Sequence, residues 1–185
     1  MRRRVFLPFV LIPLLLTALA CDAPPPPRSK TDSALFAPSG MRIHPIFTQP
    51  KAWTDATVKA NGYDGIEALI ELTDPFNDPT KAGGRVIFEL YEYRRHVPDP
   101  RGVRLAPPWV FELRTIAQQK EHWRRIGSAY SFQLPFPLIP GKTYVLTAQF
   151  ELTGDAPDQP GGAGRFFDGI VVEVPRATRM PTTRP

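Results

Sequence analysis

The segment Thr143-Tyr144-Val145-Leu146-Thr147-Ala148-Gln149-Phe150 decides the fold, because its side chains alternate over its whole length. Tyr144, Leu146, Ala148 and Phe150 alternate with Thr143, Val145, Thr147 and Gln149. Successive side chains of a strand point to opposite faces of the sheet, so a period of two is typical of a strand with one face in a core. This segment therefore predicts a half-buried β-strand.

The same period of two recurs in six other segments of the chain. They are Ile43–Thr48, Ile66–Leu72, Val86–Tyr91, Trp109–Arg114, Ala129–Leu134 and Ile170–Val174. Turn-forming pairs such as Gly83-Gly84 and Pro107-Pro108 separate them, and only residues 116–126 suit a helical turn. Short strands at this spacing predict an all-β fold, a seven-stranded antiparallel sandwich over residues 41–175.

The strand predicted for Thr143–Phe150 is preceded and begun by the run Leu138-Ile139-Pro140-Gly141-Lys142-Thr143-Tyr144. This run resembles the Leu-x-Pro-x-x-x-Tyr run of fibronectin type III and related immunoglobulin-like domains. The resemblance implies that the ring of Tyr144 packs in the core while its hydroxyl bonds backbone upstream. In the same comparison Leu138 is the apolar residue before the turn, and Pro140 lies in the turn. A transthyretin-like strand order also suits a Pro-Gly pair followed by an alternating strand.

The N-terminus carries a targeting segment. Three arginines at positions 2–4 precede an apolar run, Val5–Ala20, that ends at Cys21. The arrangement resembles the lipobox of bacterial lipoproteins, although Ala18 stands where Leu is usual. The resemblance implies that residues 1–20 are a signal peptide and that Cys21 is lipidated. A transmembrane helix, which needs about 20 apolar residues, and ordinary secretion are the alternatives.

The segments that flank the sandwich are polar or rich in proline. Residues 21–40 begin with Cys21 and hold four consecutive prolines, so we expect an extended tether. Residues 176–185 have no apolar periodicity and predict a disordered tail. Asp22, directly after the cysteine, resembles an inner-membrane retention signal of some bacteria, but inner and outer membrane both stay open.

Composition and motifs exclude several classes of function. Cys21 is the only cysteine, and the three histidines are far apart, so the sequence predicts no disulfide, metal site or cofactor. No Gly-x-Ser-x-Gly elbow is present, which disfavours an envelope hydrolase. The chain's net charge of +5 includes three arginines of the signal peptide, so its basicity does not indicate nucleic-acid binding.

Two basic segments are the candidate binding residues. Arg94 and Arg95 lie between the third and fourth predicted strands, whereas Trp123 and Arg124 lie before the fifth. Arginine binds anionic oxygens with paired hydrogen bonds, and a tryptophan ring stacks on cations or sugars. The four residues together predict a site for an anionic glycan, a cell-wall polymer or lipid headgroups. The simpler interpretation is that Trp123 covers the core and the arginines are solvated.

The sequence as a whole predicts a protein of the bacterial cell envelope that a lipid holds at a membrane. Its expected role is that of a non-catalytic binding or scaffolding module. Its expected partners are the membrane, cell-wall polymer or glycan, or another envelope protein. The main alternative is an accessory lipoprotein subunit of a multiprotein envelope or secretion complex.

Overall fold

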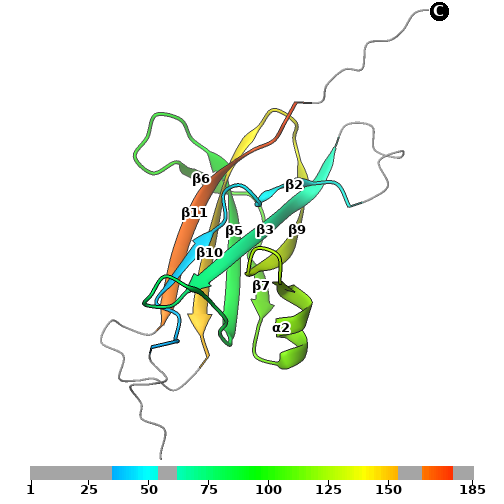
Figure 1. Cartoon of the computed structure of the whole chain (residues 1–185). Coiled ribbons are helices and arrows are strands. Elements are labelled where there is room, and N and C mark those ends of the chain that lie inside the picture. The colour runs from blue at the N-terminus through cyan, green and yellow to red at the C-terminus, as the bar shows by residue number, and fades with distance from the viewer. Residues whose placement is uncertain (1–34, 54–61, 154–163, 177–185) are drawn as a thin grey trace, which may run out of the picture.

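The computed structural model describes residues 35–53, 62–153 and 164–176, which form two antiparallel sheets packed face to face (Figure 1). The sheets do not close into a barrel, and the predicted all-β sandwich is confirmed. No helix among the described residues has the length and apolar character needed to cross a bilayer.

The first sheet is built around β3 (Tyr63–Thr73). On one side of β3 lie β1 (Gly40–Ile43) and β2 (Gln49–Lys51), and on the other lie β9 (Ala129–Leu138) and β4 (Pro79–Thr80). The two-residue strand β8 (Trp123–Arg124) pairs with the start of β9. This sheet lies in front of the other in Figure 1.

The second sheet has the order β11 (Arg165–Glu173), β10 (Thr143–Leu152), β5 (Gly84–Tyr93). Beyond β5 lie β6 (Arg101–Arg104) and β7 (Trp109–Glu112), which pair with its two halves. Helix α2 (Ile116–His122) joins β7 to β8, and Thr115 caps it by accepting a hydrogen bond from the amide of Gln118. The helix falls within residues 116–126, where the sequence allowed one.

The strand order agrees with the immunoglobulin arrangement of two sheets, ABED and GFC. In sheet order, β1, β3, β9 and β8 correspond to strands A, B, E and D, and β11, β10 and β5 correspond to strands G, F and C. The seven predicted strands correspond to β1, β3, β5, β7, β9, β10 and β11. The four others have only two to four residues each, too few for alternation to be recognised.

The first predicted strand, Ile43–Thr48, is displaced from the strand in the structure. The strand β1 ends at Ile43, and the next residues form a turn in which the amide of Thr48 donates to the carbonyl of His44. Pro45 lies in this turn, where its missing N–H costs no ladder hydrogen bond.

The core lies between the sheets and consists of the side chains that the alternation places on one face. In β3 these are Ile66, Ala68, Ile70 and Leu72, and in β10 they are Tyr144, Leu146, Ala148 and Phe150, all of them buried. Aromatic rings join the layers, since Phe88 of β5 lies 5.2 Å from Phe132 of β9. Burial of this apolar surface is the main force that holds the sheets together.

The chain enters the sandwich at the end opposite to the Tyr144 motif. The amide of Ser39 donates to Thr73 at the last residue of β3, whereas Tyr63 at its first residue pairs with Leu138. A strand of ten residues such as β10 spans about 30 Å. The Leu138–Tyr144 segment is thus separated from the entry point by the length of the sandwich.

Candidate functional site

The candidate site is built on the turn that joins β9 to β10. The hydroxyl of Tyr144, a residue only 5% exposed, accepts a 3.0 Å hydrogen bond from the amide of Ile139. The amide of Lys142 donates to the Ile139 carbonyl, and Gly141 has φ of 77°. Proline followed by a glycine with positive φ is typical of a type II turn. The arrangement is the one that the resemblance at Leu138, Pro140 and Tyr144 implied.

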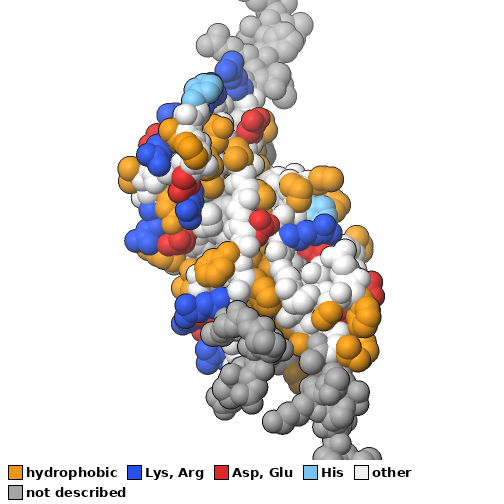
Figure 2. Space-filling view, turned by 90° about the vertical axis from the view of Figure 1, so that its left-hand side faces the viewer, with side chains coloured by type: hydrophobic (Ala, Val, Ile, Leu, Met, Phe, Trp, Pro, Cys, Tyr) orange, Lys and Arg blue, Asp and Glu red, His pale blue; other side chains and the backbone are white. Residues whose placement is uncertain are grey.

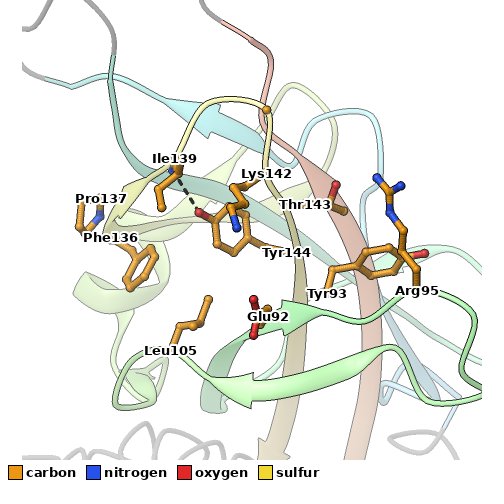
Figure 3. A pocket seen from close by; sticks show the side chains of 11 residues that line it. Glu92, Tyr93, Arg95, Leu105, Phe136, Pro137, Ile139, Lys142, Thr143 and Tyr144 are labelled. Carbon is orange, nitrogen blue, oxygen red and sulfur yellow. Dashed lines mark hydrogen bonds between the residues drawn. The ribbon is translucent and has the colours of Figure 1, made fainter.

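A pocket of about 280 Å³ opens beside this turn and is named the corner pocket here. Its walls come from β5, β9, β10 and the residues on either side of them. They are Glu92, Tyr93, Arg95, Leu105, Phe136, Pro137, Ile139, Gly141, Lys142, Thr143 and Tyr144. Figure 3 shows apolar side chains, among them Leu105 and Phe136, on one side and Tyr93 and Arg95 on the other. The pocket therefore has an apolar half and a polar half.

Several charged residues in and around the β5–β6 connection form ion pairs with one another. Arg101 forms bidentate hydrogen bonds with Asp99, and these bonds lower the pKa of the Asp99 carboxyl to about 2. Arg104 pairs with Glu89 at 3.0 Å. Among the described residues neither Arg94 nor Arg95 forms an ion pair. These two guanidinium groups are therefore available to a ligand.

Lys142 adds a second cation to the corner pocket, and it too has no ion pair within the described part of the chain. Figure 2, which faces the side of the sandwich that carries β11 and the β5–β6 connection, shows Lys and Arg side chains at its upper left. Glu92 supplies one carboxylate to the same pocket (Figure 3). Cations beside half-buried tyrosine and phenylalanine rings suit a ligand with both anionic groups and sugar rings.

The structure does not bring Trp123 and Arg124 to the corner pocket. Trp123 pairs with Tyr130 at the start of β9, whereas Arg95 reaches the pocket at the end of that strand. The two places are about 25 Å apart along β9. The four candidate residues therefore belong to two separate surfaces.

Trp123 is half-buried against the core. Its ring makes an edge contact with the ring of Tyr130 at 5.0 Å, and the ammonium group of Lys81 lies 4.3 Å from its centre. Arg124 is exposed and donates to the carbonyl of Glu121. This geometry agrees with the simpler interpretation, in which Trp123 covers the core and Arg124 is solvated.

The sequence pattern did not single out Lys142, Tyr93 or Glu92 as site residues. Lys142 lies inside the Leu138–Tyr144 motif, and Glu92 and Tyr93 directly precede Arg94. All three line the same pocket because Glu92 of β5 pairs with Tyr144 of β10. This pairing joins residues far apart in the sequence, so local patterns do not reveal it. The position of Lys142 inside the Leu138–Tyr144 motif was nevertheless a usable signal.

The polar clusters elsewhere serve structural roles. Asp74 accepts hydrogen bonds from the amides of Phe76 and Asp78, so its carboxylate stabilises a turn. The ring of His122 stacks on Phe132 and its Nδ1 lies 3.1 Å from the carbonyl of Ser131. In the described ranges no three His, Cys, Asp or Glu residues are grouped as a metal site.

Comparisons with protein families, with characterised proteins and with solved structures find no match for this chain. The argument for function therefore rests on the site itself.

Proposed function

We propose that this chain is a lipid-anchored, non-catalytic binding module of the bacterial cell envelope, and that its corner pocket takes an anionic, sugar-containing polymer. The observation that carries the proposal is that Arg95 and Lys142, which have no ion-pair partner among the described residues, line one pocket with the rings of Tyr93 and Phe136. No nucleophile with an adjacent base accompanies them there, which favours binding over catalysis.

The anchor is Cys21, which lies outside the described residues together with most of the tether. Each buried acyl methylene contributes about 0.8 kcal/mol, so two or more chains hold a protein at a bilayer. The tether joins the sandwich at the end away from the corner pocket, because residues 36–39 bond to Thr73 and Thr80. The tether is therefore attached at a distance from the pocket.

A single pocket of this size makes few contacts with a polymer, and each contact is weak. Attachment to a membrane compensates, since it raises the local concentration of pocket and polymer. Salt weakens interactions between exposed charges over a distance of about 10 Å at 0.1 M. We therefore expect binding that is modest in affinity and sensitive to ionic strength.

Retention on purified cell wall tests the pocket. The wild-type chain should be retained at low salt, whereas Arg95→Gln with Lys142→Gln should reduce retention severalfold by removing both charges. The matched control is Trp123→Ala with Arg124→Ala, which changes the other surface and should leave retention unchanged. Loss of retention in the control alone would place the ligand on that surface and contradict the proposal.

Processing of the precursor tests the anchor separately. The change Cys21→Ser should leave an unprocessed precursor, and the mature wild-type chain should carry the mass of its acyl groups. Maturation and membrane attachment that survive the substitution would contradict lipidation at Cys21 without affecting the pocket.

A second candidate function is that of an accessory subunit of a multiprotein envelope complex. A groove of about 610 Å³ crosses the outer face of the second sheet between β11 and the β5–β6 connection. Phe167, which is 66% exposed, and Val171 border it, and an exposed apolar patch favours a protein partner. Stoichiometric recovery of other envelope proteins after mild crosslinking, lost on Phe167→Ser, would support this role.

A further inference from the structure

Two apolar turns project from the outer face of the first sheet. The β1–β2 turn carries Ile46, which is 76% exposed, and Phe47. The β8–β9 turn carries Ile126, which is 94% exposed, directly after Arg124 and Arg125. These five residues are called the saddle face below.

The two turns border one shallow depression. A volume of about 410 Å³ lies between Phe47 on one side and Ile126 on the other. Its floor crosses the sheet and is lined by both polar and apolar residues, namely Gln49, Glu67, Leu69, Trp123 and Ser131. The face therefore has a mixed floor between two exposed apolar turns.

The β8–β9 turn does not need its apolar residue for the fold. The β8–β9 turn is shaped by Gly127 and Ser128, which have φ of 91° and 47°, and by a hydrogen bond from the amide of Ser128 to the carbonyl of Arg125. Ile126 at its tip packs on nothing that shields it from water. An isoleucine at the tip of a tight turn, where polar residues are usual, indicates a contact outside the chain.

The charge of the saddle face is positive. The carboxylate of Glu67 is neutralised by Lys51 at 2.8 Å, and its pKa is lowered by that hydrogen bond. Within the described ranges Arg124 and Arg125 form no ion pair. The two exposed guanidinium groups next to Ile126 complement an anionic surface.

We propose that the saddle face lies on an anionic lipid surface, with Ile46, Phe47 and Ile126 inserted among the headgroups. Arg124 and Arg125 then hydrogen-bond to lipid phosphates. Exposed apolar side chains at the tips of two turns, next to two arginines, suit a headgroup layer, which is polar and anionic at its surface and apolar below.

The proposal goes beyond the function proposed for the corner pocket and uses different residues. The lipid anchor at Cys21 would bring a bilayer within reach, but the saddle face is inferred from the described residues alone. Residues 22–34 separate Cys21 from the described part of the chain, and an extended chain of that length, at about 3 Å per residue, would let the sandwich lie on its side.

Spin labelling of the full chain in vesicles tests the proposal. One label is placed at Ile126→Cys, and the matched control at Val103→Cys, which is 71% exposed on β6 of the other sheet. With phosphatidylglycerol and phosphatidylethanolamine vesicles, the label at 126 should become several times less accessible to a water-soluble relaxing agent. The label at 103 should keep its full accessibility.

The charge contribution is tested in the same labelled chain. Arg124→Gln with Arg125→Gln should return the label at 126 to the accessibility of the control, and phosphatidylcholine vesicles should do the same. A label at 126 that stays as accessible as the label at 103 in anionic vesicles would overturn the proposal. Spin–spin coupling between copies that is independent of lipid would also overturn it, in favour of self-association.

The wild-type chain separates this test from the test of the anchor. Because Cys21 is the only natural cysteine, the wild-type chain takes up label only when that thiol is free. Label uptake by the wild-type chain would contradict lipidation, whereas the response at position 126 reports on the saddle face in either case.

Discussion

The hydroxyl of Tyr144 accepts a hydrogen bond from the amide of Ile139, five residues upstream, at 3.0 Å. This bond joins Tyr144, near the start of β10, to the β9–β10 connection, which crosses from the first sheet to the second. The ring of Tyr144 meets the ring of Phe136 edge-on, with 6.2 Å between their centres, so the same side chain forms part of the corner pocket. The fold and the candidate site thus share one residue.

Removing the Tyr144 hydroxyl should destabilise the sandwich without changing its core. The substitution Tyr144→Phe keeps the buried ring and loses one hydrogen bond, so we expect a loss of about 1 kcal/mol in the free energy of unfolding. Urea unfolding measures it. Tyr93→Phe, at a neighbouring position in the pocket, is the control and should have little effect; an equal loss in both variants would contradict the role of the bond.

The turn should be sensitive to any side chain at Gly141. Its φ of 77° is one that L-residues rarely adopt, and a Cβ would lie 3.1 Å from Cγ of Arg176. We expect Gly141→Ala to cost about 1–2 kcal/mol in urea unfolding. Gly62→Ala is the control, because a Cβ there meets nothing within 4 Å. A Gly141 variant as stable as the Gly62 variant would show that the turn adapts.

Asp168 links the two sheets where β1 approaches β11. One carboxylate oxygen accepts from the amide of Ile43 at 2.6 Å and the other from the amide of Gly169 at 2.8 Å. Asp168→Ala leaves both amides without this acceptor, and we expect a loss of about 1–3 kcal/mol in the free energy of unfolding. Asp168→Asn keeps one acceptor oxygen and should cost less. The opposite order of the two variants would contradict this account.

The ion pair of Asp99 with Arg101 should be visible in a carboxyl titration. The pKa of Asp99 is lowered from 3.8 to about 2 by hydrogen bonds from Arg101. Because the folded value is the lower one, the pair favours the folded state above pH 3.8, and this contribution disappears as the pH falls through about 2. Nuclear magnetic resonance of the Asp99 carboxyl measures the midpoint, which Arg101→Gln should return toward 3.8. An unchanged midpoint in the variant would contradict the pairing.

The fold was predictable from the sequence because the residue patterns that specify it are local. A period of two identifies the side chains of β3 and β10 that are buried, and the seven residues from Leu138 to Tyr144 specify the turn and its hydrogen bond. The position of β1 was wrong by several residues, since alternation continues through His44 into a segment that the structure forms as a turn.

The candidate site was less predictable because it depends on which strands are neighbours. Arg95 and Lys142 are 47 positions apart in the sequence, and both line the corner pocket because Glu92 pairs with Tyr144. Trp123 is held beside Tyr130 by the short pairing of β8 with β9, at the other end of the sandwich. Residue types alone suggested one site for Arg94, Arg95, Trp123 and Arg124. Only the strand pairing shows that Trp123 and Arg124 lie on a different surface from the other two.

The binding of anionic wall polymer at the corner pocket is the central claim, and mapping of backbone amide shifts tests it most directly. The full chain would be titrated with wall fragments released by muramidase digestion, at low salt. The account predicts the largest shifts in residues 92–95 and 139–144, and their loss on Arg95→Gln with Lys142→Gln. Shifts confined to residues 123–126, or no shifts at saturating fragment, would contradict it.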